Sequence, residues 1–135
     1  MSTEVIVYVL TALAAVVVVL TRLRLGRDDG GAGRLRMGRG LLNTHTVAGV
    51  LALVGWVVFL VTGNEVVGIA ALAAWWVVVI AGLGILVRWL PSRGRHASEG
   101  REDSWSEGPG LSVLAHVGML VGVGVFSWAY LTAAV

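Results

Sequence analysis

The stretch Val66-Val-Gly-Ile-Ala-Ala-Leu-Ala-Ala-Trp-Trp-Val-Val-Val-Ile-Ala-Gly-Leu-Gly-Ile-Leu-Val87 contains no charged residue and no proline. An α-helix rises about 1.5 Å per residue, so a run of this length extends over about 33 Å. The hydrocarbon core of a bilayer is about 30 Å thick. The stretch therefore predicts a helix that spans a membrane.

Three further charge-free runs cover residues 5–21, 40–64 and 108–135. The chain of 135 residues is 57% hydrophobic and 13% charged, whereas an average soluble domain is about 25% charged. This composition excludes a soluble fold. We expect an all-α membrane protein, a four-helix transmembrane bundle in a single membrane domain, residues 1–135. The predicted helices cover about 4–22, 41–62, 66–90 and 111–133.

The ten basic residues are all arginines and fall in two segments, 22–39 and 88–101, whereas the connection 62–66 carries only Glu65. Arginines in short loops stay on the cytoplasmic side of a membrane. We therefore expect a multi-pass protein of a bacterial plasma membrane, with both termini outside and both basic loops, 23–40 and 91–110, cytoplasmic. These loops are rich in Gly, Ser and acidic residues, which predicts mobility.

Several function classes are excluded or disfavoured by the same composition. The chain has no cysteine, so disulfides, thiolate metal sites and iron–sulfur clusters are excluded. No P-loop or dinucleotide fingerprint occurs in the required context, because Gly82-Leu-Gly84 and Gly122-Val-Gly124 lie inside apolar runs. We interpret the arginines as topology signals that contact lipid, not nucleic acid. A stand-alone enzyme is less expected than an electron-transfer protein, and no catalytic residue is assigned.

Only two ionisable side chains, His45 and His116, lie within the four apolar runs. The helices 41–62 and 111–133 run in the same direction, so both histidines lie about one and a half turns inside, roughly 6–8 Å below the cytoplasmic boundary. Two nitrogen ligands at equal depth are what one bis-histidine haem b requires. Zinc is disfavoured because its sites use three or four protein ligands. A proton relay lacks a second ionisable group in the outer half.

Small residues follow His45 at helical spacing. Ala48, Gly49 and Ala52 share its side of the helix and would leave room for a macrocycle. We therefore predict His45 and His116 as axial iron ligands, and Ala48, Gly49 and Ala52 as cofactor-binding residues. The alternative is that each histidine only hydrogen-bonds backbone carbonyls, lipid headgroups or nearby hydroxyls. Those hydroxyls belong to Thr44, Thr46 and Ser112.

The two halves of the chain also resemble one another. Each half reads as an apolar helix, an arginine- and glycine-rich loop, and a helix with an early histidine. This pattern predicts a two-fold repeat of helix hairpins about an axis along the membrane normal. Such an axis would place the two histidines on either side of one haem.

The segment Arg39-Gly-Leu-Leu-Asn-Thr-His45-Thr-Val-Ala-Gly-Val-Leu-Ala-Leu resembles the start of haem-binding helices in membrane cytochromes b, especially the cytochrome b-561 and ferric-reductase-like families. The resemblance covers the helix of His45 and, more loosely, that of His116. It implies that both histidines are axial ligands and that the protein shuttles electrons. Cytochrome b-561 uses four histidines for two haems, one near each face, whereas this sequence has no histidine in its outer half.

The expected function is electron transfer by a membrane-embedded b-type haem protein, as a small subunit of a respiratory or reductase complex, with quinone as a candidate partner. The alternative is a haem-free structural or assembly subunit. It would contact other membrane subunits or a second copy through the Gly118/Gly122 face, about 200° from His116. A small multidrug-type transporter would need a membrane-embedded Glu in its first helix, and Glu4 lies at the rim.

Overall fold

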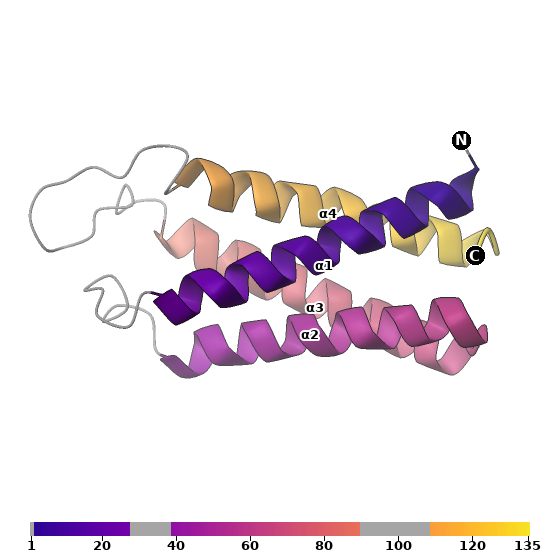
Figure 1. Cartoon of the computed structure of the whole chain (residues 1–135), viewed down its shortest axis with the longest axis horizontal. Coiled ribbons are helices and arrows are strands. Elements are labelled where there is room, and N and C mark those ends of the chain that lie inside the picture. The colour runs from indigo at the N-terminus through magenta and orange to yellow at the C-terminus, as the bar shows by residue number, and fades with distance from the viewer. Residues whose placement is uncertain (1, 28–38, 90–108) are drawn as a thin grey trace, which may run out of the picture.

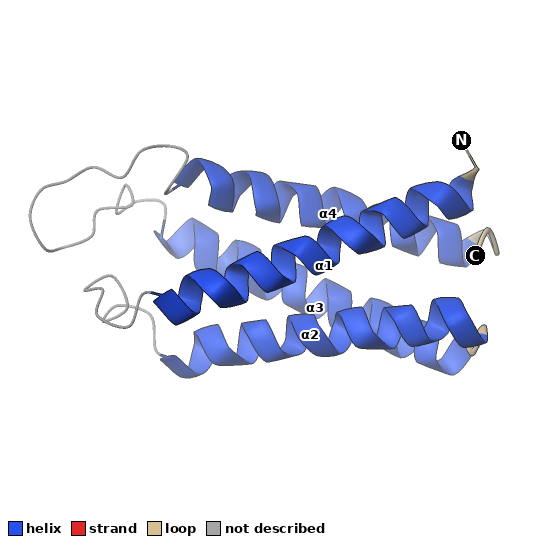
Figure 2. Cartoon of the chain, in the orientation of Figure 1, coloured by secondary structure: helices blue, strands red, loops and turns tan. Residues whose placement is uncertain are grey.

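The computed structural model describes residues 2–27, 39–89 and 109–135, and these fold into four α-helices (Figure 1). The helices are α1 (Thr3–Arg27), α2 (Arg39–Thr62), α3 (Glu65–Trp89) and α4 (Pro109–Leu131). Within the described ranges the secondary structure is helical apart from short loops and turns (Figure 2). Each helix contains a window of at least 18 residues whose mean hydropathy lies between 1.6 and 2.5. The chain is thus an all-α, multi-pass membrane protein that contacts the lipid bilayer.

The helix ends follow the apolar runs closely except in α1. We expected that helix to end near residue 22, but it continues to Arg27. The prediction was wrong because a charged residue ends the apolar run without ending the helix, and arginine is a good helix former. The other ends differ from the predicted ones by two residues or fewer. The rest of the predicted basic loops, residues 28–38 and 90–108, lies outside the described residues.

A tight turn joins α2 to α3. Gly63 has a left-handed backbone, with φ of 66°, and its N–H donates to the carbonyl of Phe59 over 2.8 Å. The Asn64 side-chain oxygen then accepts hydrogen bonds from the backbone N–H groups of Val66 and Val67. This is an N-cap, which satisfies two of the free donors at the start of α3. The turn therefore holds α2 and α3 antiparallel.

The four helices form a ring in which α2 and α4 are diagonal. Both α1 and α3 pack against α2 and α4, and α1 and α3 run opposite to α2 and α4 (Figure 1). We call the end where α1 and α3 finish and α2 and α4 begin the arginine end. The opposite end, which holds the α2–α3 turn and both termini, is the turn end (Figure 1). The common position of the two termini agrees with the expected topology.

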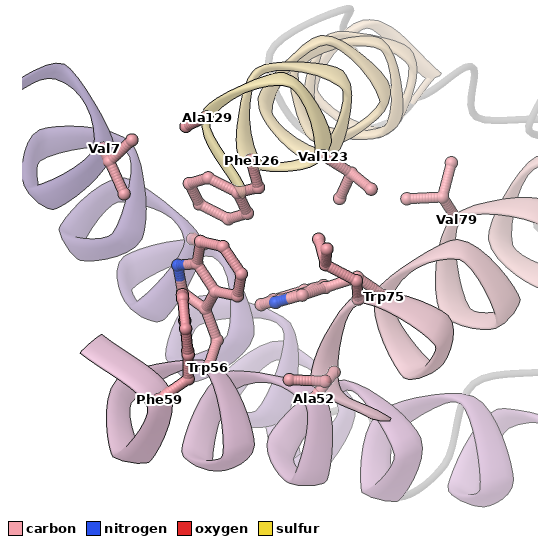
Figure 3. Packing of buried hydrophobic residues seen from close by; sticks show 12 residues of the cluster. Val7, Ala52, Trp56, Phe59, Trp75, Val79, Val123, Phe126 and Ala129 are labelled. Atoms are coloured by element: carbon pink, nitrogen blue, oxygen red, sulfur yellow. The ribbon is translucent and has the colours of Figure 1, made fainter. Parts of the chain in front are cut away.

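The interior toward the turn end is filled by an aromatic core (Figure 3), which consists of Trp56, Phe59, Trp75, Phe126 and Tyr130. Trp56 and Phe126 pack with ring centroids 4.7 Å apart, and both are essentially fully buried. The Trp56 indole N–H donates to the Thr11 hydroxyl over 3.2 Å, which ties α1 to α2. Large apolar side chains also cover the outside of all four helices, as expected where the surrounding solvent is lipid.

Candidate functional site: a histidine pair across the bundle

His45 and His116 face each other across the diagonal of the bundle. His45 lies six residues after the start of α2 and His116 lies seven residues after the start of α4, so both are about 9–10 Å from the arginine end. Their ring centroids are 6.2 Å apart and their planes differ by 11°. The structure thus brings together the two residues that the sequence singled out as ligands.

A third residue, Gly82 of α3, completes the site. A Cβ atom built on Gly82 would lie 2.8 Å from Cε1 of His45 and 2.9 Å from both Cδ2 and Nε2 of His116. Real Cβ atoms essentially never approach other atoms so closely. Both rings therefore occupy space that any other residue at position 82 would fill, and the backbone of α3 forms one side of the site.

The sequence analysis considered Gly82 only as a possible phosphate loop and missed this role. A signal was present: Gly82 lies seven residues before the end of α3, at nearly the same depth as both histidines. A glycine in a helix interior costs about 1 kcal/mol relative to alanine. The equal depth of this glycine and of two histidines on other helices indicated that it could lie beside them.

The Nδ1 atom of His45 is buried and has no hydrogen-bond partner. An unpaired polar atom in an apolar interior costs about 1–3 kcal/mol. The alternative, in which a nearby hydroxyl group forms a hydrogen bond with this histidine, therefore does not apply to its Nδ1 atom. Thr46, the neighbour of His45, is itself buried, whereas Thr44 is exposed.

The three predicted lining residues all belong to the interior of α2, at different positions relative to the pair. Ala48 is half-buried and Gly49 is buried, and a Cβ on Gly49 would lie 3.9 Å from Cγ1 of Val78 on α3. Ala52 is fully buried in the hydrophobic core. Gly49 thus allows close packing of α2 on α3. No contact between these three residues and the histidine rings is described. Their role in cofactor binding therefore stays a prediction.

The two acidic residues of the described helices lie at the opposite end of the bundle. Glu4 and Glu65 are exposed in the first turns of α1 and α3, at the turn end. Residues 2–27, 39–89 and 109–135 contain no group of three or more His, Cys, Asp or Glu side chains suited to a metal ion. The site therefore offers two imidazole nitrogens from opposite helices, a bare glycine backbone beside them and an apolar surrounding.

Comparison with known proteins adds no relative: no family model, no curated protein and no solved structure matches this chain.

Proposed function

We propose that the bundle binds one b-type haem through His45 and His116 and transfers single electrons. The observation that carries this proposal is the 6.2 Å separation of the two ring centroids on opposite helices. A metal–imidazole bond is about 2 Å long, and the bonded nitrogen lies about 1 Å from the ring centre, so two imidazoles on opposite sides of one metal have centroids roughly 6 Å apart. The separation of the pair fits this value.

One further feature of the site favours a bound group over a packing role alone. Gly82 serves the packing of the pair, because both rings occupy the space that a side chain at position 82 would fill. The buried Nδ1 atom of His45 has no hydrogen-bond partner, so burial of this histidine is not explained by a hydrogen bond at that atom. Iron coordination by the imidazole would supply the missing reason for placing a polar ring in the membrane interior.

The residues present support electron transfer more than oxygen chemistry. Haem supplies a one-electron redox centre when it is bound, and the protein sets its ligands, surroundings and exposure. His45 and His116 would both hold the iron, and a haem held by two histidines would supply electron transfer rather than oxygen binding. The apolar side chains of α2, α3 and α4 keep the site in a medium of low polarity. We further propose that the protein lies in a bacterial plasma membrane with its arginine end in the cytoplasm, as a subunit of a respiratory or reductase complex with quinone as a candidate partner.

The direct test is the reduced-minus-oxidised visible spectrum of the protein, purified from cells supplied with ample haem precursor. We expect the bands of a six-coordinate b-type haem, at one haem per chain. His45→Ala and His116→Ala should each remove them, because each variant loses one of two axial bonds. His96→Ala, which changes the third histidine of the chain, is the matched control and should keep the spectrum. A wild-type protein without any haem band would refute the proposal.

A haem-free structural or assembly subunit is the second candidate, favoured by the surface of α4. Gly118 is exposed and Gly122 is buried, and a Cβ built on either glycine would have no atom within 4 Å. Small residues four positions apart allow close approach of another membrane helix. If the protein is such a subunit, we expect it to co-purify with a partner subunit or a second copy. His45→Ala and His116→Ala should then co-purify with the same partner.

A further inference from the structure

We infer that His45 and His116, in the arrangement that the structure describes, form a site for a single Cu(I) ion held directly between their rings. This inference does not rest on the proposed haem, because a bare ion and a haem would be alternative occupants of the same pair. It is carried by the geometry of the two rings, by the backbone of α3 at Gly82 and by the donor atoms near the pair.

The two rings have the separation that a two-coordinate ion requires. Cu(I) is a d10 ion that accepts two nitrogen ligands in a line, and copper is among the metals that imidazole suits. With metal–nitrogen bonds of about 2 Å and nitrogens about 1 Å from the ring centres, such a pair has centroids roughly 6 Å apart. The observed centroids of His45 and His116 are 6.2 Å apart and the planes differ by 11°. These nearly parallel planes allow an edge of each ring to face one ion.

The atoms that border Gly82 show which edges of the rings come together. A Cβ atom built on Gly82 would lie 2.8 Å from Cε1 of His45 and 2.9 Å from Nε2 of His116. In an imidazole ring Cε1 is bonded to both nitrogens. Each histidine therefore has a nitrogen at, or one bond from, an atom that borders the same point beside α3.

The closeness of α3 to both rings favours a bare ion. A macrocycle between two axial ligands extends several ångströms from its metal in every direction perpendicular to the bond axis. Even a single methyl group added at Gly82 would lie under 3.0 Å from both histidines. A haem could therefore enter between the rings only if α3 withdrew from the pair, whereas an ion between two nitrogens displaces no backbone.

The donors and charges near the pair fit a soft monovalent cation better than a divalent one. Zinc sites use three or four protein ligands, and Mg²⁺ and Ca²⁺ require oxygen ligands. In residues 2–27, 39–89 and 109–135 the side-chain carboxylates are those of Glu4 and Glu65, both at the turn end. The cost of burying an ion in a medium of low polarity rises with the square of its charge. A single positive charge is therefore the least costly for this site.

Met119 of α4 would supply a third, weaker donor. It follows His116 by three residues, and residues three apart on a helix are neighbours on one face. Met119 is partly buried and packs against the hydrophobic core, so it lies on the inner side of α4. Thioether ligands select Cu(I), and the methionine side chain is unbranched and flexible. A sulfur donor beside two imidazoles strengthens the preference for Cu(I) over Zn(II).

The test is a titration of the purified, haem-free protein, made without a histidine tag, with Cu(I) under ascorbate and without oxygen. The ion is supplied as its coloured bicinchoninate complex, whose absorbance falls as the protein removes Cu(I). We expect one Cu(I) per chain. Zn(II) in large excess should not displace it, and displacement by an equal concentration of Zn(II) would overturn the assignment to a monovalent ion.

Four variants locate the bound ion. His45→Ala and His116→Ala should each lower the affinity for Cu(I) by more than about a hundredfold, since loss of even an outer-shell partner costs about 10–100-fold. His96→Ala, which changes the third histidine of the chain, is the matched control and should bind like the wild type. Met119→Leu keeps the side-chain volume and removes the sulfur, and should lower the affinity by about tenfold. An unchanged affinity in Met119→Leu would remove this residue from the site.

X-ray absorption of the Cu(I)-loaded wild type gives a readout that does not depend on the folding of any variant. We expect two nitrogen neighbours about 2 Å from the metal, with the outer scattering that is typical of imidazole. A shell of oxygen neighbours alone would overturn the inference. Uptake of Cu(I) that is unchanged in both His45→Ala and His116→Ala would also overturn it, because the ion would then bind elsewhere.

Haem and copper are measured separately, so the two proposals fail separately. A wild type that binds Cu(I) through the pair but never shows a haem band would overturn the proposed function and leave this inference intact. A wild type that shows the haem band, and takes up no Cu(I) when it is free of haem, would overturn this inference alone.

Discussion

Gly82 decides, at the scale of single residues, whether both imidazole rings can occupy one layer of the bundle. Its missing side chain is the space that Cε1 of His45 and Nε2 of His116 approach. The sequence predicted the two histidines because they are the only ionisable groups in the apolar runs. It did not predict Gly82, because a glycine in a membrane helix serves packing, flexibility or a ligand equally well, and only the contacts across helices distinguish these uses.

Gly82→Ala should therefore impair the site. The added methyl group forces both rings to move, and such overpacking costs typically about 1–3 kcal/mol. We expect at least a tenfold loss of haem affinity, or an altered haem spectrum, in a titration of the purified protein. Gly84→Ala is the matched control, since a Cβ at position 84 meets no atom within 4 Å. Equal haem affinity in the two variants would contradict the role assigned to Gly82.

At the scale of helices, the sequence predicted the length of each helix but not which side of it points into the bundle. Run lengths predicted four helices, because a chain in lipid must satisfy its backbone hydrogen bonds internally. Which side of each helix points inward was harder to predict, because all sides are apolar. On α2, for example, Leu51 is 64% exposed while its neighbour Ala52 is fully buried. Aromatic residues do not settle the question either, because Trp56 and Trp75 are buried whereas Trp76 and Trp128 are exposed.

The hydroxyl group of Thr11 links α1 to the rest of the bundle. It donates to the carbonyl of Val7 and accepts the indole N–H of Trp56. Thr11→Val keeps the shape but leaves the buried N–H unpaired, which costs about 1–3 kcal/mol. We expect a lower midpoint of thermal unfolding in detergent by circular dichroism. Thr132→Val, whose exposed hydroxyl bonds only carbonyls of the preceding turn, should unfold like the wild type. An unchanged midpoint in Thr11→Val would refute the link.

At the scale of the whole molecule, the bundle is asymmetric in two properties that coincide. The histidine pair lies near the end that bears the arginines, and the aromatic core fills the opposite end, which bears no arginine. The sequence predicted the charge asymmetry fully, since it requires only the order of residues. The diagonal pairing of α2 with α4 required the structure, because four spans in sequence can be arranged around a ring in more than one way.

Orientation in the membrane determines which compartment the histidine pair is nearer to. Arginines in short loops remain cytoplasmic, so a thiol at the turn end should face outward. In intact cells, Val66→Cys should react with an impermeant maleimide. Ser98→Cys, which lies between α3 and α4 in sequence, should react only after the membrane is permeabilised. The reverse pattern would contradict the cytoplasmic placement of the arginine end. With the expected pattern, the histidine pair lies in the half of the bundle that is nearer to the cytoplasm.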